Sequence, residues 1–192
     1  MSVIEVERKR ELPDATALKS RLVENGYREV GTSVEADTYY SRPDVDFLAT
    51  VECLRTRQRD GFAEITYKPA STAATHSAAD IIAKPETNVI LAGPDQAKAA
   101  NTLLDLLGMV RLCQVEKTRT TFRHPDRNEV TVTIDLITGV GSFVETEVMA
   151  DAPDAAAMLL DQVEQQLGLG DCAVVSFPYR DLVRQHIHPT LG

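Results

Sequence analysis

Two hydrophobic periods alternate along the chain. Stretches in which apolar and polar residues alternate at every second position predict β-strands, because successive side chains of a strand point to opposite faces. Such stretches are rich in Val, Ile, Thr and Tyr, and they cover residues 3–10, 34–41, 50–58, 62–68, 86–91, 111–122, 129–137 and 142–149. The pattern therefore predicts about eight strands.

Three other stretches have apolar residues three and four positions apart, which is the period of an amphipathic helix. Each begins at a Pro-Asp pair and is followed directly by Gly, and both features are typical of helix boundaries. The predicted helices cover about residues 13–25, 94–107 and 153–167. Residues 69–83 are small and polar without a clear period, and they are predicted to form a loop.

Length and composition describe one globular domain over residues 1–192. The chain is 43% hydrophobic and has a formal net charge of -9. An acidic chain without Trp is not expected to bind nucleic acid through its phosphates or by base stacking. No apolar run is long enough to cross a membrane and the N-terminus is charged, so a cytoplasmic protein is expected. Cys53, Cys113 and Cys172 are widely spaced and are expected to stay reduced.

A faint internal repeat has an offset of 140 residues. Glu5 and Glu7 correspond to Glu145 and Glu147, and the Pro-Asp pair of the first helix corresponds to that of the third. Chance similarity is an equal alternative. A structural repeat would place the two Glu pairs at corresponding positions of one sheet.

Charged residues gather on one face of several predicted strands. Residues i and i+2 of a strand point the same way, so Glu5, Glu7 and Lys9 share a face. The same alternation groups Arg55 and Arg57, Lys68, Lys117 and Arg119, Asp135, and Glu145 and Glu147. In a half-solvated sheet these charges would face water. In an eight-stranded sheet that closes into a barrel, they would point inward while the apolar face packs under the helices.

An interior with these six cations and five carboxylates needs a charged ligand, because unpaired buried charges cost several kcal/mol each. Until a ligand binds, the cations are expected to repel one another. Carboxylates suit Mg²⁺ or Mn²⁺, and Lys and Arg suit phosphate oxygens. With two divalent ions the interior charge is about +5, close to what a triphosphate of roughly -4 neutralises. A metal-bound triphosphate satisfies both sets.

The same residues resemble a known family. Glu5-Val-Glu-Arg-Lys9 resembles the E-x-E-x-K signature of the CYTH group, the triphosphate tunnel metalloenzymes. This group includes class IV adenylate cyclases, thiamine triphosphatases and inorganic triphosphatases. The supporting stretches follow in family order over nearly the whole chain: Leu54-Arg-Thr-Arg57, Ile65-Thr-Tyr-Lys68, Val115-Glu-Lys-Thr-Arg119, Val132-Thr-Ile-Asp135, residues 139–147 and Pro178-Tyr-Arg-Asp-Leu182.

The resemblance implies an α+β fold, in which an eight-stranded antiparallel closed β-barrel forms the triphosphate tunnel and helices flank it. It implies that two Mg²⁺ or Mn²⁺ ions are held by Glu5, Glu7, Asp135, Glu145 and Glu147. It also implies that phosphates are held by Lys9, Arg55, Arg57, Lys68, Lys117 and Arg119. Within these sets, Lys9, Lys68 and Asp135 are expected to act in catalysis. Family members commonly carry closely spaced acids near residues 76–88, where this chain has only Lys84-Pro-Glu86, so the role of Glu86 stays open.

The segment 131–148 most resembles the class IV cyclases, which implies conversion of ATP to 3′,5′-cyclic AMP and pyrophosphate. A triphosphatase acting on thiamine triphosphate or inorganic triphosphate is the alternative. A third reading is a non-catalytic nucleotide- or polyphosphate-binding module. The expected partner is a small triphosphate, and a homodimer is compatible with the sequence.

Other candidate residues carry less weight. His186 and His188 are expected to lie in a strand-like or disordered tail rather than in a metal site. Asp37, Tyr39 and Tyr40 either border the tunnel or pack in the core. The chain has no G-x-S-x-G, Walker A or H-E-x-x-H motif, which argues against those hydrolase and nucleotide-binding classes.

Overall fold

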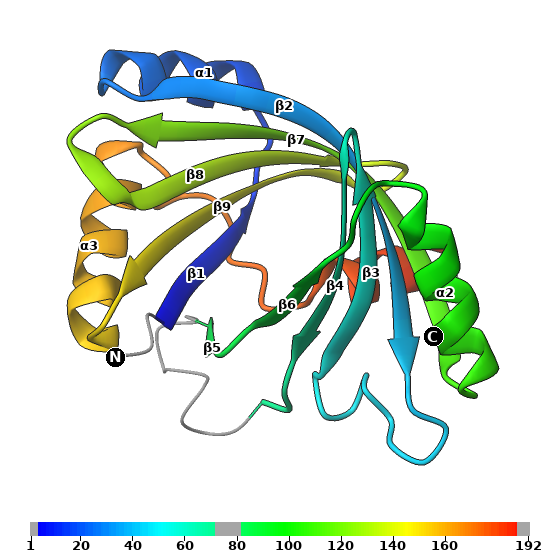
Figure 1. Cartoon of the computed structure of the whole chain (residues 1–192). Coiled ribbons are helices and arrows are strands. Elements are labelled where there is room, and N and C mark those ends of the chain that lie inside the picture. Colours follow the sequence, from blue (N-terminus) through cyan, green and yellow to red (C-terminus); the bar gives the residue numbers. More distant parts are fainter. Residues whose placement is uncertain (1–3, 72–81, 188–192) are drawn as a thin grey trace.

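The computed structural model describes residues 4–71 and 82–187, and a strongly curled antiparallel sheet is its main element (Figure 1). The strands are β1 (Ile4–Glu11), β2 (Arg28–Ser41), β3 (Cys53–Arg59), β4 (Phe62–Lys68), β5 (Ile82–Lys84), β6 (Thr87–Ile90), β7 (Val110–His124), β8 (Arg127–Ile137) and β9 (Gly141–Ala150). Their order across the sheet is β5-β1-β9-β8-β7-β2-β3-β4-β6, with antiparallel neighbours throughout.

The sheet curls so far that its two edge strands are consecutive in the sequence. β5 pairs with β1, β6 pairs with β4, and only Pro85 and Glu86 separate β5 from β6. Within the described part of the chain β5 and β6 do not pair with each other, so the barrel has one seam. The predicted antiparallel barrel with flanking helices is confirmed, although full closure is overstated.

All eight predicted strands are present, and the sheet has a ninth. This extra strand, β5, lies at the end of the predicted 69–83 loop. A strand of three residues is too short to show an alternating pattern, so periodicity could not predict it. Residues 72–81 of that loop lie outside the described residues. Within the described part, β2 begins at Arg28, six residues before its predicted start.

In the described residues four helices accompany the sheet: α1 (Ala15–Glu24), α2 (Gln96–Leu106), α3 (Pro153–Gln166) and α4 (Tyr179–Ile187). The first three are those predicted from the Pro-Asp and Gly boundaries. The fourth corrects the prediction for His186, which lies in a helix rather than in a strand-like or disordered tail. His188 lies outside the described residues. No helix in the described ranges is long and apolar enough to span a membrane.

The boundaries of α1 have clear local causes. The side chain of Asp14 caps the helix by accepting a hydrogen bond of 2.9 Å from the Ala17 amide. Gly26 follows the helix with a φ of +85°, which a residue with a Cβ rarely adopts. A Cβ there would also lie 2.9 Å from the His124 ring, so this position requires glycine.

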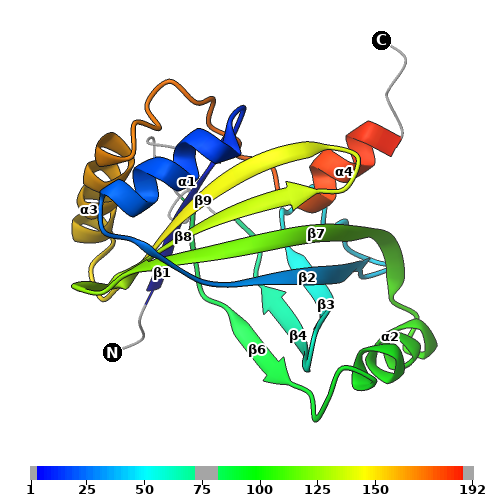
Figure 2. The same ribbon diagram turned by 90° about the horizontal axis from the view of Figure 1, so that it is seen from above.

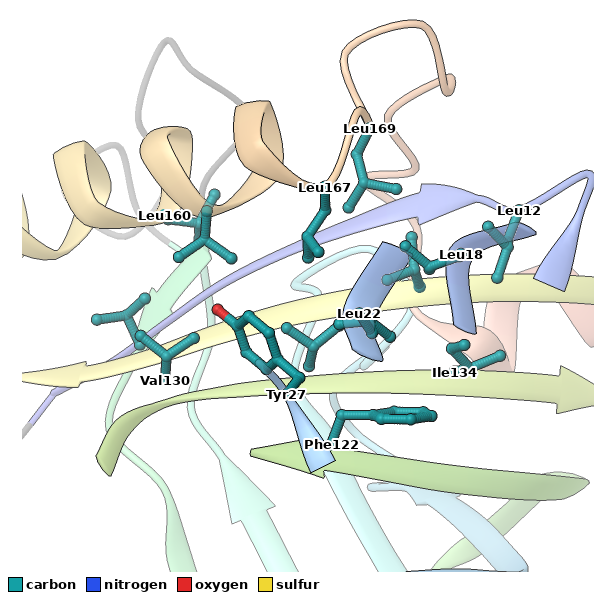
Figure 3. Close-up of a cluster of buried hydrophobic side chains, with 14 of the residues drawn as sticks. Leu12, Leu18, Leu22, Tyr27, Phe122, Val130, Ile134, Leu160, Leu167 and Leu169 are labelled. Carbon is teal, nitrogen blue, oxygen red and sulfur yellow. The ribbon is translucent and has the colours of Figure 1, made fainter. Parts of the chain in front are cut away.

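The main hydrophobic core lies outside the barrel, where α1 and α3 pack side by side on the sheet (Figure 2). Leucines of both helices meet outward-facing residues of β7 and β8, such as Phe122, Val130 and Ile134 (Figure 3). A smaller cluster joins α4 to the barrel through Tyr179 and Val183. Because the helices cover one face of β1, β8 and β9, the other face, which carries the predicted site residues, points inward, as the barrel alternative predicts.

Candidate functional site

A cavity of about 260 Å³ lies inside the barrel, and most of the residues that line it are charged. Ten of the eleven predicted site residues line it: Glu5, Glu7, Lys9, Arg55, Arg57, Lys68, Lys117, Arg119, Glu145 and Glu147. The eleventh, Asp135, is fully buried behind the wall, where it contacts Arg119. The structure therefore brings all eleven to one place, while their roles stay predictions.

Carboxylates from β1 and β9 form the acidic side of the cavity. In the antiparallel pairing of these strands, Glu7 lies directly opposite Glu147 and Lys9 lies opposite Glu145. The two Glu-x-Glu strands of the sequence repeat are thus neighbours, and alternation turns both pairs inward.

Burial and mutual repulsion disfavour the charged forms of two carboxylates on this acidic side, Glu147 and Glu5. Burial raises the pKa of Glu147 to about 8, and Glu5, Glu145 and Glu7 add to the shift, although Arg119 opposes it. Burial also raises the pKa of Glu5, and repulsion from Glu7 and Glu86 contributes. A bound cation would relieve this repulsion, and carboxylates such as Glu5, Glu7 and Glu147 are the kind of oxygen donor that a hard divalent ion prefers.

The two other predicted metal ligands are held by Arg119. Its Nε lies 2.7 Å from Asp135 Oδ1, and its Nη2 donates to Glu145. Burial disfavours the charged form of Glu145, but Arg119 and Lys9 outweigh it and lower the pKa of that carboxyl. Among the described residues, no three His, Cys, Asp or Glu side chains converge on a single metal position. Use of Asp135 and Glu145 as ligands would require them to leave Arg119.

The basic side of the cavity rests on two carboxylates that the sequence did not mark as partners. Arg57 donates two hydrogen bonds of 2.7 Å to Asp37, and Glu35 lies 3.2 Å from its Nε. Lys117 Nζ lies 3.3 Å from Glu35. Both carboxylates are only 1% exposed. The cations are therefore partly neutralised without a ligand, which corrects the expectation that they only repel one another.

The sequence does contain a pattern that indicates these carboxylates. Glu35, Asp37 and Tyr39 occupy every second position of β2, so they share one face of the strand. Their partners depend on register, which places Glu35 opposite Lys117 and Asp37 opposite Arg57. Tyr39 lines the cavity, whereas Tyr40 is buried and its hydroxyl donates to Asn101 Oδ1 at 3.1 Å. The structure thus answers the alternatives that the sequence left open for these two tyrosines.

Lys68 bridges the seam of the barrel. Its Nζ lies 3.3 Å from Glu5 of β1 and 2.8 Å from Glu86, in the link between the edge strands. Glu86 is thereby placed in the cavity wall, where Glu64 and Lys84 also lie. Sequence reasoning did not assign roles to these three residues.

Tyr179, the first residue of α4, also lines the cavity. Its hydroxyl donates a hydrogen bond of 2.8 Å to Asp135. Lys9 Nζ lies 4.2 Å and Lys117 Nζ 5.2 Å from the centre of its ring, which is close enough for cation–π attraction. The tyrosine falls within one of the stretches that carry the family resemblance, but its contacts could not be read from the sequence.

Comparison with known proteins agrees with this architecture. The model of the CYTH domain matches residues 3–174. The chain belongs to the CYTH domain family. A curated relative from Methanocaldococcus jannaschii, named "Putative adenylate cyclase", is 28% identical over 145 residues, which are 76% of this chain and 77% of the relative.

Two solved structures illustrate how widely the family fold is shared. The PH1819 protein of Pyrococcus horikoshii has a TM-score of 0.77 and 25% identity, with 94% of this chain and 98% of that chain covered. A protein from Hippeastrum has a TM-score of 0.69 and 15% identity, with 96% of each chain covered. That structure is described as a "Putative adenylyl cyclase" with a dominant triphosphatase activity. At this identity the similarity shows the fold alone.

Proposed function

We propose that this CYTH protein is a metal-dependent enzyme that binds a triphosphate inside the barrel and cleaves it. The observation that carries the proposal is the two-sided cavity, in which a basic wall faces an acidic cluster with raised pKa values. Lys and Arg match phosphate oxygens, and carboxylates match divalent ions, so a metal–triphosphate complex complements both sides.

The basic wall would bind and orient the phosphates. Arg57 uses its Nε and Nη2 groups on Asp37, which leaves further N–H donors of its guanidinium for a phosphate. Asp37 and Glu35 keep the wall ordered before a ligand arrives, and this preorganisation lowers the cost of binding. Lys9 and Lys68 also lie beside the glutamates, with Nζ 3.9 Å from Glu145 and 3.3 Å from Glu5 respectively.

Glu5, Glu7 and Glu147 would hold Mg²⁺ or Mn²⁺, with Asp135 and Glu145 as further ligands if Arg119 turns to the phosphates. When bound, such ions stabilise charge on phosphate oxygens and make a coordinated hydroxyl more acidic. The arginines and lysines stabilise the negative charge that develops on the departing phosphate group.

Cyclisation of ATP is the first reaction that we assign to this site. The ribose 3′-hydroxyl attacks the α-phosphorus, its proton is released, and the bond between the α-phosphorus and the bridging oxygen breaks to free pyrophosphate. The resemblance of residues 131–148 to class IV cyclases and the name of the Methanocaldococcus relative favour this assignment.

Hydrolysis of a triphosphate is the second candidate, and the cavity favours it. Its volume of about 260 Å³ lies below the roughly 300–1,000 Å³ of pockets that enclose drug-sized ligands, and its lining is dominated by charge. Such a cavity suits the phosphate chain better than the nucleoside. Water would then attack a terminal phosphorus of inorganic triphosphate or thiamine triphosphate.

Phosphorus NMR of the products tests the proposal. ATP and inorganic triphosphate are each incubated with the protein and Mg²⁺ or Mn²⁺, and Glu5→Gln serves as the matched control. Cyclic AMP with pyrophosphate from ATP identifies the cyclase, whereas orthophosphate with pyrophosphate from inorganic triphosphate identifies the hydrolase. No conversion of either compound with either metal would refute both ATP cyclisation and inorganic triphosphate hydrolysis and would favour the binding module.

A further inference from the structure

Two buried cations hold the backbone of one loop beside the cavity. The loop, residues 42–52, connects β2 to β3. Arg180 donates to the carbonyls of Glu52 at 2.7 Å and Phe47 at 3.2 Å, while Lys84 donates to the Val51 carbonyl at 2.7 Å. Arg180 is 1% exposed and Lys84 is 7% exposed. Three carbonyls of a single loop therefore depend on side chains from distant parts of the chain.

The backbone conformation of this loop is energetically unfavourable, so contacts from other parts of the chain must stabilise it. Val51 has a φ of +56°, which is rare for a β-branched residue, and its side chain lines the cavity. Phe47 is 2% exposed, and its amide donates to the Ser41 hydroxyl at 3.1 Å. A strained residue persists only where its surroundings hold it, and here those surroundings include the two cations.

Arg180 also directly follows Tyr179 in the sequence, and Tyr179 contacts several charged groups of the site. Tyr179 donates to Asp135, and its ring lies against Lys9 and Lys117. Lys9 Nζ donates in addition to the Phe177 carbonyl at 2.9 Å. The segment 177–180 is thus fastened to the loop through Arg180 and touches the charged groups of the cavity through its other residues.

We propose that Arg180 is a positioning residue for the phosphate site. By tying the first turn of α4 to the 42–52 loop, it sets the place of Tyr179, and through Tyr179 the places of Lys9 and Asp135. Arg180 is not among the residues that line the cavity, so it acts through its neighbour. The inference rests on the proposed triphosphate site for its functional meaning.

Arginine suits this task for a geometric reason. Its planar guanidinium reaches two carbonyls of the loop and the carboxylate of Asp181 at 2.7 Å simultaneously. A lysine at this position has a compact ammonium on a flexible stem and cannot reproduce that planar fork. Arg180→Lys should therefore restore only part of the wild-type behaviour.

A double-mutant cycle of Arg180→Met and Tyr179→Phe, measured by chemical denaturation without ligand, tests the coupling. If Arg180 acts through Tyr179, the destabilisation by both changes together is smaller than the sum of the two single effects. Should Arg180→Met not fold, Arg180→Lys replaces it in the cycle. Additive effects would overturn the proposal. This measurement needs no ligand, so it stays informative even if the proposed function fails.

Titration with inorganic triphosphate and Mg²⁺ supplies the functional readout, with Arg184→Met as the matched control. Arg184 lies on the same helix, five residues after Tyr179, and donates to the Leu112 carbonyl at 3.1 Å. We expect Arg180→Met to weaken triphosphate binding about tenfold and the control to change it by less than about twofold. Faster hydrogen exchange in the 42–52 loop with unchanged affinity would overturn the proposal, because Arg180 would then be only a structural anchor.

Discussion

Lys68 reaches across the seam of the barrel to Glu5, with 3.3 Å between its Nζ and the carboxylate Oε1. A residue predicted to bind phosphate thus neutralises a residue predicted to bind metal. Burial opposes the charge of Lys68, but Glu7, Glu5 and Glu86 outweigh it and raise its pKa. Without a ligand, the two sides of the cavity are paired with each other, and ligand binding exchanges these contacts for new ones.

This pairing predicts opposite effects of Lys68→Met on the two ligands. Removal of a cation beside Glu5 and Glu86 should strengthen the binding of Mn²⁺ alone, because the carboxylates lose a competitor. The same change should weaken the binding of inorganic triphosphate with Mg²⁺ by about 1 to 3 kcal/mol. Isothermal titration calorimetry measures both affinities. A loss of Mn²⁺ affinity in the variant would contradict the pairing as we interpret it.

Glu5→Gln and Glu145→Gln should abolish metal-dependent turnover and leave the fold intact. Each change removes an anionic oxygen while it preserves side-chain volume. Turnover is followed by product analysis and folding by circular dichroism. Glu116→Gln, on an exposed position of β7, is the matched control and should keep full activity. Full activity in Glu5→Gln or Glu145→Gln would remove that residue from the metal site.

Arg57 and Lys117 should differ in how they affect stability. Loss of Arg57 leaves buried Asp37 with weaker partners, Arg55 at 3.6 Å and the Tyr39 hydroxyl at 3.5 Å, so Arg57→Met should destabilise the protein by about 3 kcal/mol. Burial, followed by Arg119 and Arg57, lowers the pKa of Lys117 to about 8, so Lys117→Met should leave stability unchanged or raise it. Denaturation by urea measures both.

A second substitution separates the causes of the Arg57 effect. The double variant Arg57→Met, Asp37→Asn should recover most of the lost stability, because it removes the stranded charge. If the double variant is as unstable as Arg57→Met alone, the loss comes from packing rather than from the ion pair.

Metal affinity should depend on pH through Glu147. Its pKa is raised to about 8, so in the ligand-free protein this carboxyl keeps a proton at neutral pH and loses it as pH rises through about 8. A metal ion needs the carboxylate, so Mn²⁺ affinity should rise toward pH 8 and level off above it. Calorimetry in two buffers of different ionisation enthalpy counts the released proton. A proton release that persists in Glu147→Gln would assign the effect to another group.

Strand alternation was sufficient to predict which charged residues share a face, although it left open whether that face is inward or solvated. Glu5, Glu7 and Lys9 occupy every second position of β1. Val6 of β1 and apolar residues of β8 and β9 point to the opposite face and pack under α1 and α3. The choice between the two alternatives follows from the packing of the helices on the apolar face, which turns the charged face inward.

Strand alternation could not predict which residues of distant strands pair with each other. Glu35 lies opposite Lys117 only because β2 and β7 adopt one particular register, and no local pattern states that register. β5 is too short to show a period, and α4 depends on contacts such as those of Arg180 with the 42–52 loop. The internal neutralisation of the cavity follows from these contacts, which explains why the sequence alone suggested simple repulsion.

Thermal-shift titration of the wild type and Lys117→Met with inorganic triphosphate and Mg²⁺ tests the central claim most directly. A ligand that binds only the folded state raises the melting temperature, and the rise grows with the logarithm of the ligand concentration divided by its Kd. We predict a concentration-dependent rise for the wild type and a much smaller rise for Lys117→Met, whose folding should not be impaired. No rise in the wild type, or equal rises in both proteins, would contradict a triphosphate site built from the cations inside the barrel.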